Sequence, residues 1–153
     1  MGVRMASEKE RLEALKLFIV LSRSHKVLHE ATNQFFQDNG LNPTEFAVLE
    51  LLYHKGRQPL QKIGNKILLA SGSITYVVDK LERRGFIRRI ASEEDRRVTY
   101  AEISSEGKQY MDKLFPRHEL QLVELLNVLT VDEKATLTDL LKKLGLSIKN
   151  LSN

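Results

Sequence analysis

The stretch Ser92-Glu93-Glu94-Asp95-Arg96-Arg97 joins two runs of strand-forming residues, Phe86 to Ala91 and Val98 to Ile103. Upstream lies a helical segment that ends Leu81-Glu82-Arg83-Arg84-Gly85, with a basic C-terminal end and a glycine that can stop it. The two runs predict a β-hairpin with arginines at its tip. A hairpin of this kind directly after a basic helix is the layout of a winged helix. It suits a DNA duplex, because the helix fits a major groove and the tip reaches a neighbouring minor groove.

Two helices are expected at the start of the chain. Apolar residues recur at helical spacing from Glu8 to Asp38, and Asn39-Gly40 then ends this long helix. In the next segment Asn42 can cap a helix, Pro43 suits its first position, and Glu45 can reach back to the cap. Lys55-Gly56 closes that second helix. The length of the first helix requires a large partner for its apolar stripe.

A helix-turn-helix is expected next. A short third helix runs from Leu60 to about Leu68 after Pro59. A fourth helix starts at Ser71-Gly72-Ser73 and continues to Arg84. Its inward face carries Ile74, Val77, Val78 and Leu81, which follow helical spacing. Two short helices joined by a turn, with small polar residues opening the second, are typical of DNA-reading folds.

Two more helices follow the hairpin. Ser104 opens a helix from Ser105 to about Leu129, in which Pro116 predicts a kink. Thr130 and Glu133 form a capping box for a sixth helix that is expected to end at Gly145. The leucine stripes of the flanking helices need a partner. The simplest one is a second copy of the chain, and the alternative is packing within a monomer.

The composition fits a single domain over residues 1–153 and argues against several kinds of protein. Apolar residues make up 42% and charged residues 29% of the chain, as in ordinary globular proteins. Cysteine is absent, which excludes disulfides and thiolate metal sites. Residues 55–97 hold 11 Lys or Arg and 5 Asp or Glu, although the whole chain has a net charge of only +4. This concentration of basic residues favours nucleic-acid phosphate as partner. No apolar run spans a membrane, and we expect a cytoplasmic protein.

Two stretches together resemble a known family. They are Ser73-Ile74-Thr75-Tyr76-Val77-Val78-Asp79-Lys80-Leu81-Glu82-Arg83-Arg84-Gly85-Phe86-Ile87, and Asp95-Arg96-Arg97 followed by Ile103-Ser104 and Gly107. Their order and spacing resemble the MarR family of bacterial transcription regulators. The resemblance covers nearly the whole chain and departs at Ser104, where many members have threonine.

The resemblance implies a mainly α-helical homodimer with a small β-hairpin wing. Its winged helix-turn-helix core would span residues 42–104, and residues 8–38 and 105–150 would form N- and C-terminal dimerisation helices. Such a dimer binds a palindromic operator, usually as a repressor, and a small aromatic or phenolic ligand often releases it. The family's wing pattern falls on Asp95 and Arg97. The arginine enters the minor groove, and the aspartate holds its guanidinium.

The residues expected to contact DNA lie on the fourth helix and on the hairpin. On the helix they are Ser71, Ser73, Thr75, Tyr76, Lys80, Arg83 and Arg84. On the hairpin they are Asp95, Arg96 and Arg97. Side chains at the N-terminal end of the helix read bases, whereas the basic residues at its C-terminal end grip phosphate. Lys62 and Lys66 on the third helix could do the same.

The candidate effector pocket is lined by Phe18, His25, Phe46 and Tyr53, because a pocket in this family would lie among the first, second and fifth helices. The alternative for each of these residues is a place in the core. His25 and His29 have a metal-ligand spacing, but no third ligand is evident, so no metal site and no cofactor are expected. No sequence signature of an enzyme is present. The alternative to an operator-binding regulator is a winged-helix module that binds protein or RNA.

Overall fold

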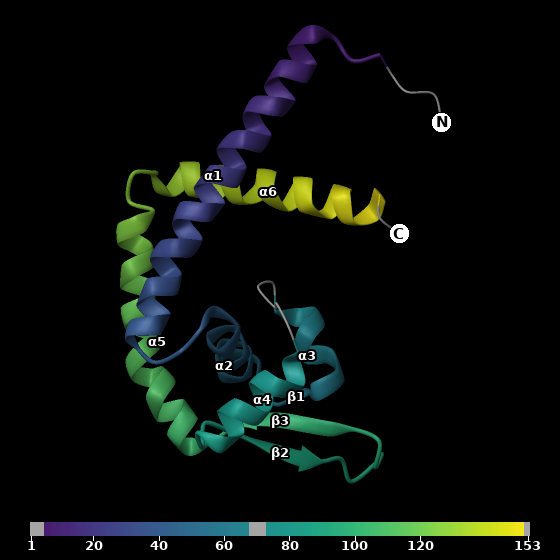
Figure 1. Cartoon of the computed structure of the whole chain (residues 1–153), viewed down its shortest axis with the longest axis vertical. Coiled ribbons are helices and arrows are strands. Elements are labelled where there is room, and N and C mark those ends of the chain that lie inside the picture. The colour runs from purple at the N-terminus through teal and green to yellow at the C-terminus, as the bar shows by residue number, and fades with distance from the viewer. Residues whose placement is uncertain (1–4, 68–72, 152–153) are drawn as a thin grey trace. The chain divides into compact units, whose positions relative to one another are not determined.

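The computed structural model describes residues 5–67 and 73–151. Its elements are α1 (Glu8–Asp38), α2 (Pro43–Lys55), β1 (Gln58–Pro59), α3 (Leu60–Lys66), α4 (Ile74–Arg83), β2 (Ile87–Ala91), β3 (Thr99–Ile103), α5 (Ser105–Leu125) and α6 (Val131–Leu151) (Figure 1). The chain divides into two compact units, residues 1–115 and 116–153, and the division falls inside α5 at Pro116. The fold is therefore mainly α-helical with one small sheet, as the sequence predicts.

The first two helices begin at the residues that can cap them. Ser7 and Glu10 form a capping box at the start of α1. The Asn42 side chain accepts from the Glu45 N–H at 2.8 Å, and the Glu45 carboxylate accepts from the Asn42 N–H at 3.1 Å. The predicted cap of α2 is thus confirmed. Each reciprocal pair satisfies backbone N–H groups that have no partner inside the helix.

Helix α4 ends as its sequence predicts. Gly85 has a φ of 77°, a left-handed conformation that costs glycine little. The Gly85 N–H donates to the Glu82 carbonyl at 2.9 Å, and the Phe86 N–H donates to the Leu81 carbonyl at 3.0 Å. These two bonds close a Schellman motif. They turn the chain sharply from the helix into the first strand of the hairpin.

The sheet has three antiparallel strands in the order β1-β3-β2. Strands β2 and β3 form the predicted hairpin, with Ile87 opposite Ile103 and Ala91 opposite Thr99. The sequence did not predict β1, which pairs Gln58 and Pro59 with the far side of β3. Two residues, one of them a proline, are too short to show the alternation that marks a strand.

The core of the first unit lies among α2, α3, α4 and the sheet, with contributions from the end of α1 and the start of α5. It contains Val48, Leu49, Leu52, Ile63, Val78 and Leu81, each at most 1% exposed. Of the four residues predicted for the inward face of α4, Val77, Val78 and Leu81 are buried and Ile74 is half-buried. This core fixes α4 against the hairpin, which is the geometry that a DNA-reading surface needs.

The helices after the hairpin differ from prediction in their ends. Helix α5 ends at Leu125, four residues earlier than expected. The capping box of α6 is confirmed, because Thr130 Oγ1 accepts from the Glu133 N–H and the Glu133 carboxylate accepts from the Thr130 N–H. The predicted end of α6 at Gly145 is wrong, since the helix continues to Leu151. A glycine costs a helix only about 1 kcal/mol, and Leu146, Lys149 and Leu151 after it favour helix. Within the described residues, no helix is long and apolar enough to cross a membrane.

The apolar stripes of the long helices are uncovered in the single chain. On α1, Leu15 is 59% and Phe18 69% exposed. On α6, Leu140 is 57% and Leu146 63% exposed. Large apolar side chains in such number are rarely left in water without a partner.

We expect Gly107→Ala to destabilise the fold and Gly145→Ala to stabilise it slightly. A Cβ on Gly107 would lie 2.1 Å from the Phe86 carbonyl oxygen, whereas a Cβ on Gly145 would meet nothing within 4 Å. The first change should cost about 2–3 kcal/mol through overpacking, and the second should gain about 0.5–1 kcal/mol through helix propensity. Thermal unfolding followed by circular dichroism measures both. Equal midpoints for the two variants would contradict the close approach at Gly107.

Candidate nucleic-acid interface

The hairpin tip presents one arginine held by one aspartate. Asp95 Oδ1 accepts from the backbone N–H of Arg97 at 3.0 Å and from its Nε at 3.1 Å, and Oδ2 accepts from a terminal guanidinium nitrogen at 3.1 Å. The side-chain hydrogen bonds from Arg97 are the largest cause that lowers the pKa of Asp95, and the backbone hydrogen bond from Arg97 adds to the effect. The Arg97 side chain remains 90% exposed. The pair thus presents an oriented, solvated cation at the end of the hairpin.

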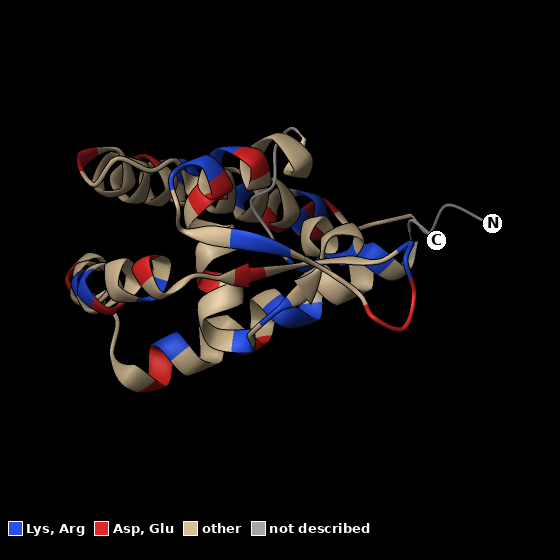
Figure 2. Ribbon diagram, turned by 90° about the horizontal axis from the view of Figure 1, so that it is seen from below, with Lys and Arg blue, Asp and Glu red and all other residues tan. Residues whose placement is uncertain are grey.

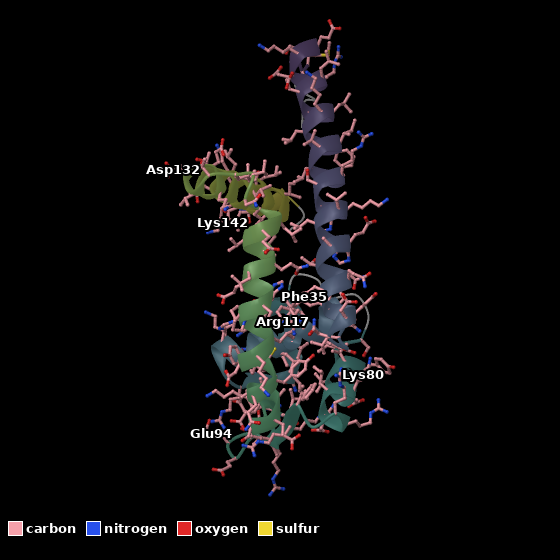
Figure 3. The ribbon with its side chains drawn as sticks, turned by 90° about the vertical axis from the view of Figure 1, so that its left-hand side faces the viewer. Phe35, Lys80, Glu94, Arg117, Asp132 and Lys142 are labelled. Carbon is pink, nitrogen blue, oxygen red and sulfur yellow. The ribbon has the colours of Figure 1, made fainter. Side chains whose placement is uncertain are left out.

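The rest of the tip is exposed and mixed in charge. Arg96 lies beside Arg97 and is exposed, as are Glu93 and Glu94. Figure 2 shows the acidic turn of the hairpin in red next to the blue of the arginines. Figure 3 labels Glu94 at the hairpin turn and Lys80 on α4. The two carboxylates would repel phosphate, so the tip can approach DNA favourably only through its arginines.

The N-terminal part of α4 exposes the side chains that were expected to read bases. Ser73, Thr75 and Tyr76 are exposed, and Tyr76 is 64% exposed. Ser73 precedes the helix without a capping bond from its side chain, so its hydroxyl is not used to start α4. Ser71 lies outside the described residues. Three of the four predicted side chains therefore stand on one accessible helix end.

The basic residues near the C-terminal end of α4 have internal partners. Lys80 Nζ lies 2.5 Å from Oε1 of Glu45, whose side chain is 1% exposed. Arg84 donates to the Gly40 carbonyl at 2.7 Å, and its guanidinium lies 4.8 Å from the centre of the Phe86 ring. Arg83 is exposed and makes one long bond, of 3.4 Å, to the Asp79 carbonyl. Lys80 thus anchors α4 to the first turn of α2, and Arg84 anchors it to the turn between α1 and α2. Arg83 extends into solvent.

An ion cluster joins α4 to the hairpin. Arg89 on β2 forms ion pairs with Asp79 and with Glu82, the second at 2.8 Å. The hydrogen bond to Asp79 is the largest cause that raises the pKa of Arg89. The Arg89 N–H also donates to the Glu82 carboxylate at 2.9 Å. Sequence reasoning missed this cluster. Helical spacing puts Asp79 and Glu82 on one face, and that signal could have suggested a shared partner.

The residues predicted for an effector pocket do not share one environment. Phe46 is 4% exposed and stacks on Phe36 in the core, with ring centres 4.4 Å apart. Tyr53 donates to Asp112 at 2.6 Å and contacts the His54 ring edge-on. Phe18 and His25 are exposed on α1. Phe46 serves the core because it faces inward from the first turns of α2.

A different hollow lies beside α2. Its volume is about 520 Å³, and it is lined by Ala47, Glu50, Leu51, His54, Lys55, Lys66 and Ile67. Burial raises the pKa of Glu50, although nearby His54 opposes the shift. The hollow combines apolar walls with one half-buried carboxyl group, a combination common in small-molecule sites.

The described residues offer no metal centre. The His25 and His29 rings stack with centres 5.8 Å apart. Within the described ranges, however, no group of three or more His, Cys, Asp or Glu residues could hold an ion.

Comparisons with known proteins agree with this geometry. The model of the MarR family matches residues 41–99. The HTH-type transcriptional regulator MhqR of Bacillus subtilis is 53% identical over 141 residues, which are 92% of this chain and 97% of that protein. The chain therefore belongs to the MarR family of DNA-binding transcriptional regulators.

Two solved structures show the same fold. The MarR family regulator Sco3205 of Streptomyces coelicolor, in complex with DNA, has a TM-score of 0.80 at 18% identity. The match covers 94% of this chain and 90% of that one. NadR in complex with 4-hydroxyphenylacetate has a TM-score of 0.70 at 19% identity, over 94% of this chain and 96% of that one.

We expect Lys80→Met to destabilise the protein and Arg83→Met to leave its stability nearly unchanged. Lys80→Met removes the closest cation from the buried Glu45 and leaves it with Arg84 at 3.7 Å. The cost should be about 1–3 kcal/mol for Lys80 and within about 0.5 kcal/mol for Arg83. Urea unfolding of the two variants measures the difference. Equal stability would show that Lys80 is not needed to compensate Glu45.

Proposed function

We propose that this protein is a homodimeric repressor that binds a palindromic operator and is released by a small hydroxylated aromatic ligand. The observation that carries the DNA-binding mode is the oriented, 90% exposed Arg97 on a hairpin fixed beside α4. The arginine would enter a minor groove while α4 lies in the adjacent major groove. A regulator of this class would act in the cytoplasm, where bacterial DNA lies.

The proposed contacts divide into residues that recognise bases and residues that bind phosphates. Ser73, Thr75 and Tyr76 would meet base edges, because they are exposed at the N-terminal end of α4. Arg83 and Arg96 would neutralise phosphates and add affinity without sequence information. Ser71, Lys80 and Arg84 remain candidate contacts from the sequence. The last two would have to contact DNA with the part of their side chains that their internal partners leave exposed.

The proposed dimer would cover the apolar stripes of α1, α5 and α6. Exposed residues of these helices include Leu12, Leu15, Phe18, Leu120, Val123, Leu137 and Leu140. A two-fold dimer has identical patches on both subunits and presents two reading helices about 34 Å apart, one turn of B-form DNA. A palindromic site is the DNA counterpart of that symmetry.

The proposed ligand rests on two observations. NadR, which shares the fold, was solved with the hydroxylated aromatic acid 4-hydroxyphenylacetate. The hollow beside α2 has a volume of about 520 Å³, within the usual range of ligand sites. Phe18 and His25 would join such a site only if the second subunit brought α1 near it. A ligand there would shift the population of dimers toward a spacing that no longer fits the operator.

Selection from a random-sequence duplex pool tests sequence-specific binding. We expect the protein to enrich a two-fold symmetric site with half-sites about 10 base pairs apart. Binding should weaken steeply with salt, because counterions leave the phosphates. If no sequence is enriched and the salt response is flat, the protein is instead a winged-helix module for protein or RNA.

We expect Arg97→Ala to weaken binding to the selected site by about 1–3 kcal/mol. Arg88→Ala is the matched control, because Arg88 lies on the same hairpin but pairs with Glu102 at 2.8 Å, away from the tip. Fluorescence anisotropy measures both variants. Equal affinities for Arg97→Ala and the unaltered protein would refute the role of the hairpin tip.

We expect Leu15→Glu to split the dimer. A buried carboxylate without a partner would oppose association across the stripe of α1. Lys9→Glu is the control, because it introduces a carboxylate on the same helix at an exposed position that already carries a charge. Sedimentation should show 17.6 kDa for the first variant and twice that mass for the control. A monomer in the unaltered protein would contradict the proposed assembly.

A further inference from the structure

A hollow of about 510 Å³ separates the start of α3 from the hairpin tip. The α3 side contributes Pro59, Gln61 and Lys62, and the hairpin side contributes Asp95, Arg97 and Tyr100. Each wall therefore carries one cation, Lys62 on the helix and Arg97 on the tip. The separation of the two walls decides whether both cations can meet the same duplex.

One side chain bridges the two walls. Gln61 Nε2, in the first turn of α3, donates to the backbone carbonyl of Arg97 at 3.2 Å. The two residues are 36 positions apart in the chain. The bond fixes a peptide group and not the arginine side chain, so it leaves the guanidinium open to solvent.

The other hydrogen bonds of the tip are local. The Ser92 N–H donates to the Val98 carbonyl at 3.0 Å, and the Val98 N–H donates to the Asp95 carbonyl at 2.9 Å. The Asp95 N–H donates to Ser92 Oγ at 3.2 Å. These bonds, with the Asp95–Arg97 pair, shape the turn internally. Within the part of the chain that the structure describes, Gln61 supplies the hydrogen bond from residues 92–97 to a helix.

We propose that Gln61 is a positioning residue that sets where the hairpin tip stands relative to the reading helix. Asp95 orients the guanidinium within the turn, but it moves with the turn. Gln61 ties the turn to α3, whose buried Ile63 belongs to the same core as α4. The tip and α4 are thereby fixed in one frame, and binding need not order the hairpin first. This inference rests on the proposed insertion of Arg97 into DNA.

A double-mutant cycle tests the proposal. Gln61→Met keeps the length of the side chain but removes the donor. We expect it to weaken binding to the selected operator by ~3–10-fold, as the loss of one neutral hydrogen bond does. In an Arg97→Ala background the same change should alter affinity by less than about two-fold, because the group that Gln61 positions is gone. Gln109→Met, an exposed glutamine on α5, is the matched control and should bind normally.

The outcomes separate this inference from the proposed function. If Arg97→Ala alone binds as tightly as the unaltered protein, the tip has no role in binding, and both proposals fail. If Arg97→Ala weakens binding but Gln61→Met does not, only the positioning role fails. Equal losses from Gln61→Met in both backgrounds would mean that Gln61 contacts DNA itself, which also overturns positioning.

A measurement without DNA checks the physical cause. In the free protein, Gln61→Met should lower the ¹⁵N order parameters of amides 93–97, because the turn loses its bond to α3. The carboxyl group of Asp95 should still titrate below its ordinary value of 3.8, since its pair with Arg97 is intact. Unchanged order parameters would show that something other than Gln61 holds the tip, and would overturn the proposal.

Discussion

The orientation of the reading surface depends on the hydroxyl group of Ser104. Its Oγ donates to the Gly85 carbonyl at 2.5 Å and accepts from the Gly107 N–H at 3.0 Å. The Ser104 N–H donates to the Phe86 carbonyl at 2.9 Å. The side chain and the backbone of one small residue therefore join the end of α4, the start of the hairpin and the start of α5. Many members of the family have threonine at this position. Threonine carries the same hydroxyl group, so serine can make the same hydrogen bonds here.

Some of the basic side chains in residues 55–97 pair with carboxylates of the same chain. The basic segment 55–97 suggests that many cations are available to DNA. Arg89 is instead paired with two carboxylates, and Lys80 with a buried one. These ion pairs hold α4 against α2 and against the hairpin. Other cations of this segment are exposed, among them Arg83 at the end of α4 and Arg97 at the hairpin tip. Binding affinity would then depend on their placement more than on net charge.

The sequence predicted features that depend on near neighbours in the chain. The span of α1, the cap at Asn42 and the stop at Gly85 follow from residues within a few positions of each other. Features that depend on distant partners were missed or misjudged. The pairing of Gln58 and Pro59 with β3 leaves no periodic signal. The burial of Glu45 beside Lys80 joins residues 35 positions apart, and the same side chain had already been explained as a cap. Phe46 stacks on Phe36 in the core, which is one of the two placements that the sequence left open.

Pro59 lies in an edge strand of the sheet, and this position affects how molecules of the protein associate in concentrated solution. Strand β1 is one edge strand of the sheet, and it is two residues long with Pro59 as its second residue. A proline offers no N–H to an approaching strand, and so short an edge strand offers few groups for pairing. The other edge strand, β2, carries the charged side chains of Arg88 and Arg89. Both edges are therefore poor templates for sheet extension by a neighbouring molecule, which disfavours fibrillar association.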